Sequence, residues 1–526
     1  MGASYSPSSR RKPFSRRTVL ILLLCTIVIL FFLANSDSSY NLLPLSLNLF
    51  HRSSRSYFHL LVPTTTADLN LCRLLYSAAV LNYPTPILVG WNATGEYDIS
   101  TSSIAKITGT IRYLESLPPE RNDDLVLIVD GSDVWLQLRP DVLISRYFDV
   151  NAAAEERLAE DFGEGVMELE NIRQTILFGP DKFCWPADYN RPACWAIPQS
   201  TVGKWALGPH TDSGGSMNRA RWLNSGTIMG NVKDLLELFK GTMVMMSREY
   251  DEEAEDVVRQ SDQMYLADLW GTQEWVRTEI WRNLTDIWGR RELFNENRQP
   301  PPPNGDATYP EWEDGQKTEF HIGVDYESAV FQTAAGYEAW LGWTHYDYYN
   351  PITKTLSSSK KSKSSNKRRI KSTAGKFYLP DDIGNSPAPF PAGFRPQDAT
   401  RSDKQASGKE LQTWSGLPLG TNMATKQIFA VFHFTVTGGK DMIDWWWSRM
   451  WYVPYGMELL YAAVRETNRE RKPITRGRID GRVWWNAEGE DEVQKPWTQK
   501  GGVWSDMGAW LGWEDMCQIH EEEMFA

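Results

Sequence analysis

The pattern that most constrains the fold is an alternation of short apolar runs with amphipathic stretches between residues 57 and 129. Three runs have the length and the β-branched content of buried strands: YFHLLVP, PTPILVGW and LVLIV. The stretches between them, ADLNLCRLLYSAAVLNY and IAKITGTIRYLESL, repeat apolar residues at helical spacing. Strands that alternate with helices form a mostly parallel sheet with helices on its faces. We therefore expect an α/β, Rossmann-type fold with helices on both faces of the sheet.

Polar side chains follow the first and third predicted strands. Thr64 and Thr66 come after the first, and Asp130 and Asp133 come directly after LVLIV. Ligands of such sheets bind at the carboxyl ends of the strands. Two carboxylates there could bind Mn²⁺ or Mg²⁺, which prefer oxygen ligands. Asp-Gly-Ser is equally a common turn sequence, in which an aspartate bonds to its own backbone. The two residues alone leave a metal site and a turn open.

Later segments carry polar residues that have both structural and functional interpretations. FCWPADYN contains Trp185, although Trp-Pro is a common packing pair. WLNSGTIMG contains Asn224 and Ser225, although Asn-Ser-Gly is a common turn. SDQMY places Asp262 at the start of a predicted helix, where Ser261 could be the N-cap. IGVDYESAVFQ could be a strand and its turn, and IFAVFHFT (428–435) returns to a strand pattern.

Taken in order, these segments resemble the glycosyltransferase region of the procollagen lysyl hydroxylases, which are nucleotide-sugar transferases with the GT-A fold. The resemblance covers roughly residues 57–345, with a return near 430–440. It rests on Asp130 and Asp133 after an apolar strand, Phe-Cys-Trp-Pro at 183–186, Leu-Asn-Ser-Gly at 223–226, Asp-Gln-x-Tyr at 262–265, and Asp325 with Ser328 and Phe331-Gln332. It implies an enzyme that transfers a hexose from a UDP-sugar to a hydroxyl group of a glycan or protein acceptor.

The resemblance also implies roles for individual residues. Asp130 and Asp133 would bind Mn²⁺ (or Mg²⁺) together with the UDP-sugar, and His433 would be the third ligand. The other implied residues surround the donor: Trp185, Asn224 and Ser225 near the sugar, Asp262 in sugar orientation or catalysis, Thr64 and Thr66 at the nucleotide, and Gly438, Gly439 and Lys440 at the phosphates.

The segment around His433 departs from the family pattern. A phenylalanine follows the histidine where a glycine is expected, and the loop to Lys440 is longer by one residue. A histidine on an apolar strand is also often a core residue. The alternative function is therefore a catalytically inactive carbohydrate-binding or scaffold protein on the same fold.

A second metal-binding pattern is present at His210-Thr-Asp212, which has the His-x-Asp spacing of an iron facial triad. His321 or His345 could supply its third ligand. Its neighbours are loop-like, and no pattern of a double-stranded β-helix follows. We therefore expect the transferase part of the family without the hydroxylase domain.

The N-terminal segment predicts a membrane anchor. Residues 1–17 form a basic tail, 18–34 are uncharged and apolar, and 35–56 form a Ser-rich stem. Seventeen residues are at the short end of what spans a bilayer. A cleaved signal peptide would end in a small-residue site, which is poorly matched here. The positive-inside rule then predicts a single-pass type II protein with a lumenal catalytic domain. A short span favours the Golgi or endoplasmic reticulum membrane.

The cysteines and glycosylation sequons are compatible with that lumenal location. Cys184 and Cys194 could form a disulfide in an oxidising compartment, whereas Cys72 and Cys517 could pair or stay free. Sequons begin at Asn92 and Asn283, which would make the chain a glycoprotein.

For the rest of the chain we expect one domain with insertions. The transferase domain would span 57–440, interrupted by a Pro-rich insertion at 295–317 and a basic, low-complexity one at 353–410. A Trp-rich, acidic extension would follow at 441–526. The formal net charge of −12 argues against a nucleic-acid partner.

Overall fold

The computed structural model describes eleven stretches that belong to one compact unit between Ser53 and Ala526. They are residues 55–93, 102–208, 219–249, 261–288, 307–312, 315–347, 377–395, 413–435, 440–469, 472–487 and 498–526. The predicted tail and anchor lie outside these residues, as do the stem up to residue 54 and most of the insertion at 353–410. Within the described stretches, no helix is both long enough and apolar enough to cross a membrane.

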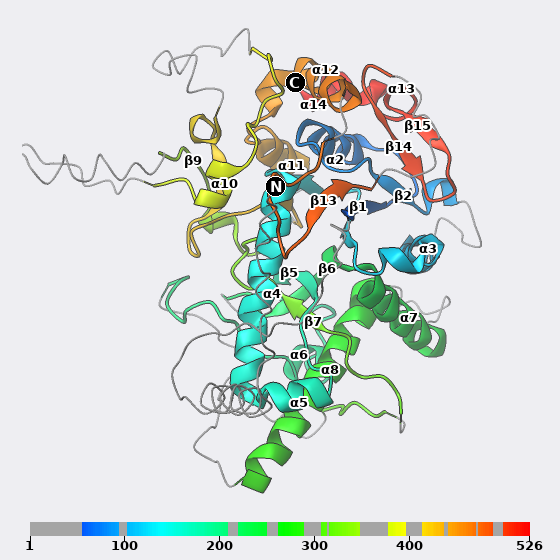
Figure 1. Ribbon diagram of the computed structural model, residues 1–526, viewed down its shortest axis with the longest axis vertical. Helices are drawn as coiled ribbons and strands as arrows, with labels where there is room; N and C mark the ends of the chain where they lie inside the picture. Colours follow the sequence, from blue (N-terminus) through cyan, green and yellow to red (C-terminus); the bar gives the residue numbers. More distant parts are fainter. Residues whose placement is uncertain are drawn as a thin grey trace, which may run out of the picture. The chain divides into compact units, whose positions relative to one another are not determined.

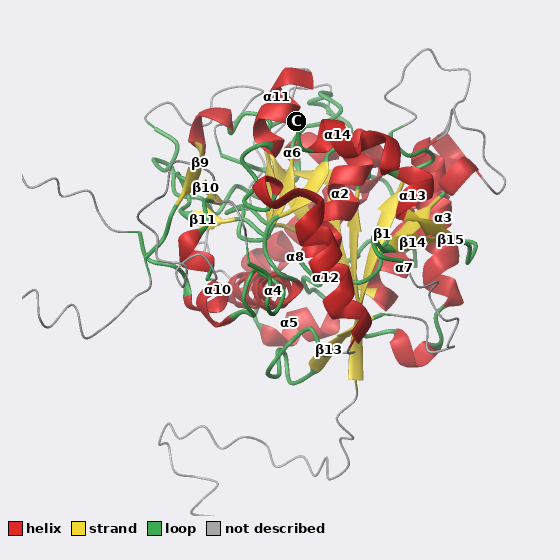
Figure 2. Cartoon of the chain, turned by 90° about the horizontal axis from the view of Figure 1, so that it is seen from above, coloured by secondary structure: helices red, strands yellow, loops and turns green. Residues whose placement is uncertain are grey.

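A nine-stranded mixed sheet forms the centre of the fold (Figure 2). Its order is β15-β14-β2-β1-β3-β6-β5-β7, and β13 also pairs with β1. The pairings of β6 with β3 and β5, and of β14 with β15, are antiparallel, and the other pairings are parallel. The strands are β1 (Arg55–Pro63), β2 (Ile87–Val89), β3 (Leu125–Val129), β5 (Ile176–Asp181), β6 (Trp222–Asn231), β7 (Ile322–Val324), β13 (Val483–Asn486), β14 (Gly502–Ser505) and β15 (Trp510–Gly512). The predicted α/β class with a mostly parallel sheet is confirmed.

Helices cover both faces of this sheet, because alternate residues of each strand point to opposite sides. Leu125, Leu127 and Val129 of β3 belong to a core shared with α2, α4 and α12. Val126 and Ile128 belong to a second core, shared with α3, α7 and α8. The helices are α2 (Leu69–Val80), α3 (Ser102–Ser116), α4 (Pro140–Phe162), α5 (Glu164–Leu169), α6 (Pro192–Trp195), α7 (Val232–Glu249), α8 (Asp262–Trp288), α10 (Asp381–Asn385), α11 (Lys440–Trp447), α12 (Gly456–Arg469), α13 (Trp513–Met516) and α14 (Glu521–Met524).

Two small sheets lie outside the central one. In the first, β12 (Val431–His433) pairs antiparallel with β4 (Val134–Leu136) and parallel with β8 (Phe331–Thr333). In the second, β10 (Leu419–Asn422) pairs antiparallel with β9 (Leu341–Thr344) and β11 (Gln427–Ile428). β4 begins directly after Asp133. Its pairing with β12 therefore places residues 431–433 beside the turn that follows β3.

The C-terminal stretch from residue 441 is part of the same fold. It supplies β13, β14 and β15 to the central sheet and places α12 against α2. In Figure 1 the orange and red elements of this stretch lie beside the blue α2 and β2. A disulfide between Cys72 and Cys517 joins α2 covalently to the C-terminal stretch, and a second disulfide joins Cys184 and Cys194. Trp446, Trp451 and Trp484 are fully buried, so they are core residues.

Candidate functional site

The turn after β3 is fixed at the carboxyl edge of β1 and β3, beside the first half of the antiparallel strand β6. The Asp130 amide donates to the Gly226 carbonyl of β6 at 3.0 Å, and the Gly131 amide donates to the Pro63 carbonyl of β1 at 3.3 Å. A Cβ added to Gly131 would lie 3.1 Å from the Cβ of Thr64, so the turn packs against the end of β1. Two of the predicted site segments therefore meet at this edge.

Asp133 and His433 lie side by side although they are far apart in the sequence. His433 pairs in register with Val134, and the Phe434 amide donates to the Asp133 carbonyl at 2.9 Å. The His433 Nε2 atom is 3.1 Å from the Asp133 Oδ2 atom. Burial alone would lower the pKa of His433, but Asp133 and the carboxylates of Asp130 and Asp181 raise it above its ordinary value.

The His433 ring lies directly against the backbone of β6. A Cβ added to Gly226 would lie 2.2 Å from His433 Cε1, which is impossibly close. Only glycine allows the small sheet to approach β6 to this extent. The predicted Leu-Asn-Ser-Gly segment thus has a packing role at its last residue.

A buried lysine joins Asp130 to Asp262. The Lys106 Nζ atom on α3 is 2.8 Å from Asp130 Oδ1 and 2.8 Å from Asp262 Oδ2, and it donates to the Ser225 carbonyl at 2.8 Å. Burial alone would lower the pKa of Lys106, but the two carboxylates raise it well above its ordinary value. Burial, together with repulsion from Asp262 and Asp133, raises the pKa of Asp130 despite the lysine. Asp262, the first residue of α8, therefore lies in one ion-pair cluster with Asp130.

Asn224 and Ser225 are held by bonds inside the protein. The Asn224 side chain donates to Asp181 Oδ2 at 3.1 Å and accepts from the Gly226 amide at 2.9 Å. The Ser225 amide donates to Gln263 Oε1 at 3.1 Å. Burial raises the pKa of Asp181, which ends β5 at this same edge. Neither Asp181 nor Gln263 was predicted as a site residue, although Gln263 belongs to the Asp-Gln-x-Tyr motif and Asp181 lies two residues before the Phe-Cys-Trp-Pro motif.

The remaining predicted site residues either lie near this edge of the sheet or fall outside the residues that the structure describes. Trp185 is about half exposed and follows β5 by four residues, in the loop of the Cys184–Cys194 disulfide. The Thr64 hydroxyl donates to the carbonyl of Thr66 at 3.0 Å. Lys440 is the first residue of α11, whereas Gly438 and Gly439 lie outside the described residues.

Asp133 and His433 fit a shared metal ion, and Asp130 is oriented differently. Adjacent ligand atoms of an octahedral ion with bonds of about 2.1 Å are about 3 Å apart, which matches the Asp133–His433 distance. The Asp133 Oδ1 atom is buried and accepts no hydrogen bond from the part of the chain that the structure describes. Asp130 instead faces Lys106. Among the residues that the structure describes, no group of three His, Cys, Asp or Glu side chains is arranged to hold a metal. A third ligand from Asp130 requires its carboxylate to turn away from the lysine.

Asp325, which the resemblance names, and His321, which the iron-type pattern names, contact other groups of the protein. Asp325 accepts hydrogen bonds from the amides of Ala329, Val330 and Phe331, so it fixes the turn before β8. The His321 Nδ1 atom is 3.5 Å from Asp234 Oδ2. His321 directly precedes β7 and Asp234 lies in the first turn of α7 after β6, so the pair lies at the opposite edge of the sheet from the turn after β3. His210 and Asp212 lie outside the described residues.

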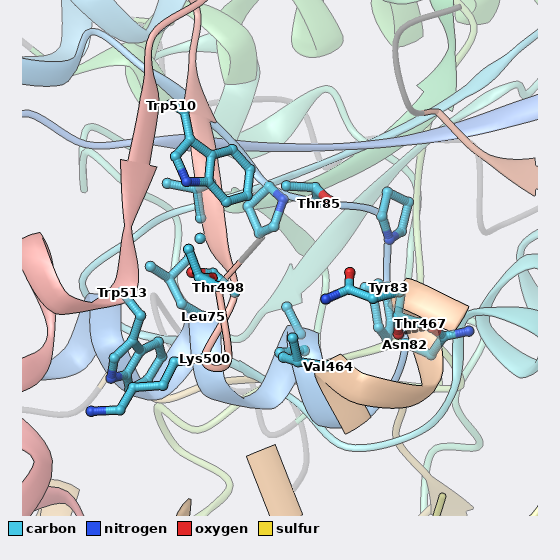
Figure 3. A pocket seen from close by; sticks show the side chains of 18 of the residues that line it. Leu75, Asn82, Tyr83, Thr85, Val464, Thr467, Thr498, Lys500, Trp510 and Trp513 are labelled. Atoms are coloured by element: carbon cyan, nitrogen blue, oxygen red, sulfur yellow. Dashed lines mark hydrogen bonds between the residues drawn. The ribbon is translucent and has the colours of Figure 1, made fainter. Parts of the chain in front are cut away.

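A separate, small apolar pocket contains none of the predicted site residues (Figure 3). It has a volume of about 80 Å³ and lies between α2, α12 and β14–β15, with Leu75, Val464 and Trp510 in its wall. Its lysine, Lys500, is already paired with Glu521 at 2.6 Å. The pocket therefore offers packing surface but no reactive group.

Neither a scan against protein-family models nor a search of curated proteins finds a match to this chain, so no family is assigned to it.

Proposed function

We propose that the chain is a metal-dependent glycosyltransferase of the GT-A type, which moves a hexose from a UDP-sugar to a hydroxyl of a glycan or protein. The observation that carries the proposal is the contact between Asp133 and His433 at the carboxyl edge of the sheet. The resemblance assigns both residues to one metal. They lie far apart in the sequence, so no local sequence pattern accounts for their contact. The mixed α/β sheet with helices on both faces is compatible with this fold.

In the proposed reaction, Asp133, His433 and Asp130 would hold Mn²⁺ or Mg²⁺. Such an ion would supply positive charge to offset the negative charge that develops on the departing UDP. Lys106 compensates the charge of Asp262 and holds that carboxylate in place at the start of α8. Asp262 then orients the donor sugar or acts in catalysis, and Asn224 and Ser225 shape the pocket with Trp185. Thr64 and Thr66 approach the nucleotide, and Gly438, Gly439 and Lys440 approach its phosphates.

The proposed location is the lumen of the Golgi or endoplasmic reticulum, with residues 18–34 as a type II anchor. Two disulfides support an oxidising compartment, because such bonds form and persist there and are rare in the cytosol.

A second candidate function is a catalytically inactive binding or scaffold protein. It is favoured by the ion pair of Asp130 with Lys106, which places an ammonium group where a metal would need a ligand. Such a protein could bind a carbohydrate but would have no requirement for a metal-bound diphosphate.

The deciding experiment measures UDP binding by the full-length protein with and without Mn²⁺, using calorimetry. For a transferase we expect Mn²⁺ to strengthen UDP binding by about tenfold or more. The double variant Asp130→Ala plus Asp133→Ala should abolish this coupling. The matched control is Asp123→Ala, which should leave the coupling between Mn²⁺ and UDP unchanged. Asp123 is exposed and lies two residues before β3, at the opposite end of that strand from Asp130.

Release of UDP from a panel of UDP-sugars, measured on the same proteins, then identifies the donor. Many transferases slowly hydrolyse their own donor, so no acceptor is needed. Equal UDP affinity with and without Mn²⁺, in a folded wild-type protein, would rule out the metal site and favour the scaffold function.

A further inference from the structure

A cavity of about 820 Å³ opens at the amino-terminal end of β1, beside β13. Its wall is built from β1, β13, the first residues of α4, the end of α12 and the segments 387–392 and 472–476. The candidate site lies beyond the other end of β1, which is nine residues long and therefore spans about 30 Å. The cavity is thus separate from the candidate donor site.

The cavity gathers positive charge in an otherwise acidic chain. Four cationic residues line it, namely Arg55, Arg139, Lys472 and Arg476, against two carboxylates, Asp141 and Glu466. The chain as a whole has a formal net charge of −12. A local excess of cations is therefore a specific feature of this cavity.

The two carboxylates do not form ion pairs with these arginines. Asp141 accepts a hydrogen bond from the Ser386 hydroxyl at 2.9 Å, and Glu466 accepts one from the Ala392 amide at 3.3 Å. Among the residues that the structure describes, the Arg139 guanidinium donates to the Ala388 carbonyl, at 3.0 and 2.8 Å. The two carboxylates thus accept hydrogen bonds from neutral groups, and the Arg139 guanidinium donates to a neutral carbonyl.

Arg139 is partly buried and lies close to a second positive charge. Burial lowers the pKa of Arg139, and the nearby positive charge of Arg476 lowers it further, although Asp141 and Glu466 act in the opposite direction. An anion bound between these two arginines would relieve both effects. Guanidinium groups bind phosphate, sulfate and carboxylate through paired hydrogen bonds.

Aromatic residues line the same cavity as the arginines. Trp485 and Tyr57 are half-buried and line the cavity, and Phe390 lines it from the segment 387–392. The Arg55 guanidinium carbon lies 4.9 Å from the centre of the Trp485 ring. An aromatic face next to cations suits a ligand that has an apolar ring face and a negative group. The volume is within the range that holds a small organic molecule.

We propose that this cavity binds a sugar that carries an oxyanion ester, either a sugar phosphate or a sugar sulfate. The ester would lie between Arg139 and Arg476, and the ring against Trp485. The proposal does not depend on the transferase function, because the cavity shares no residue with the candidate donor site.

The test titrates the full-length protein with glucose 6-phosphate, N-acetylglucosamine 6-sulfate, unmodified glucose and inorganic phosphate, using calorimetry. We expect one or both esters to bind, and glucose and inorganic phosphate to bind at least tenfold more weakly. The two esters distinguish the phosphate from the sulfate source. Arg476→Gln should weaken binding of the ester about tenfold or more, because it removes a charge-assisted hydrogen bond. Arg478→Gln changes an exposed arginine outside the cavity wall and should leave the affinity within about twofold.

Two further results decide the interpretation. The variant Asp130→Ala plus Asp133→Ala should bind the ester as the wild type does, which separates this cavity from the donor site. Trp485→Ala should weaken binding of the ester but not of inorganic phosphate. The proposal would be overturned if no ester binds, if glucose binds equally well, or if Arg476→Gln and Arg478→Gln have equal effects in folded proteins.

Discussion

At the scale of single residues, Lys106 is the side chain on which the candidate site most depends. Lys106→Met removes the ammonium group that lies 2.8 Å from both Asp130 and Asp262. We expect a loss of about 3 kcal/mol of unfolding free energy, because two partly buried carboxylates lose their shared partner. The loss is at the low end for such pairs because Asp130 is one-third exposed. Urea denaturation of the purified protein measures it.

Lys240→Met is the matched control for that variant. Lys240 is 2.6 Å from Glu115, and both side chains are about half exposed. Its removal should cost less than about 1 kcal/mol, since solvent screens such a pair. Equal losses in the two variants would contradict the central role of Lys106, and Lys106→Arg should recover part of the stability by keeping the charge.

The sequence indicated some of these residues and not others, for a physical reason. Asp130, Asp133 and His433 belong to motifs whose order resembles a known family, and the structure brings Asp133 and His433 together. Lys106 and Asp181 have no motif of their own. Their place at the site arises from the packing of α3 on the sheet and from the pairing of β5 with β6, which a local pattern does not record.

At the scale of secondary-structure elements, the junction between β6 and the small sheet of β12 depends on Gly226. A methyl group there would lie 2.2 Å from His433 Cε1. We expect Gly226→Ala to cost about 1–3 kcal/mol of stability, as overpacking of a well-packed core does. It should also abolish Mn²⁺-dependent UDP binding, because His433 must move. Thermal denaturation and calorimetry measure the two effects.

Gly203→Ala serves as the control, because nothing lies within 4 Å of a Cβ added at Gly203. It should change stability by less than about 0.5 kcal/mol. If Gly226→Ala changed neither the stability nor the Mn²⁺-dependent binding of UDP, the result would contradict the close approach of β12 to β6.

The elements themselves were partly predictable. The strands and helices between residues 57 and 129 follow from period and composition, and they are present as β1, α2, β2, α3 and β3. The reversed direction of β6 was not predictable, because it is set by pairing with β3 and β5 rather than by its own residues. The strand predicted at 428–435 is also shorter in the structure, because only Val431–His433 pair as β12.

At the scale of the whole molecule, the C-terminal stretch was the hardest part to place from the sequence. Its strands in the central sheet are only three or four residues long, so they carry little periodic signal. The Trp-rich composition suggested a separate extension, yet several of these side chains fill the core around α2. What assigns the stretch to the fold is its long-range pairing with β1 and β2.

The disulfide between Cys72 and Cys517 should accordingly stabilise the whole molecule. It links residues separated by 445 positions, whereas Cys184–Cys194 spans 10. If the bridges act by restricting the unfolded chain, the first contributes about 6 kcal/mol and the second about 3 kcal/mol. We therefore expect Cys72→Ala plus Cys517→Ala to lower the urea midpoint more than Cys184→Ala plus Cys194→Ala. The reverse order would mean that the C-terminal stretch contributes little to the stability of the central sheet. Reductant should lower the midpoint of the wild-type protein and leave a variant lacking all four cysteines unchanged.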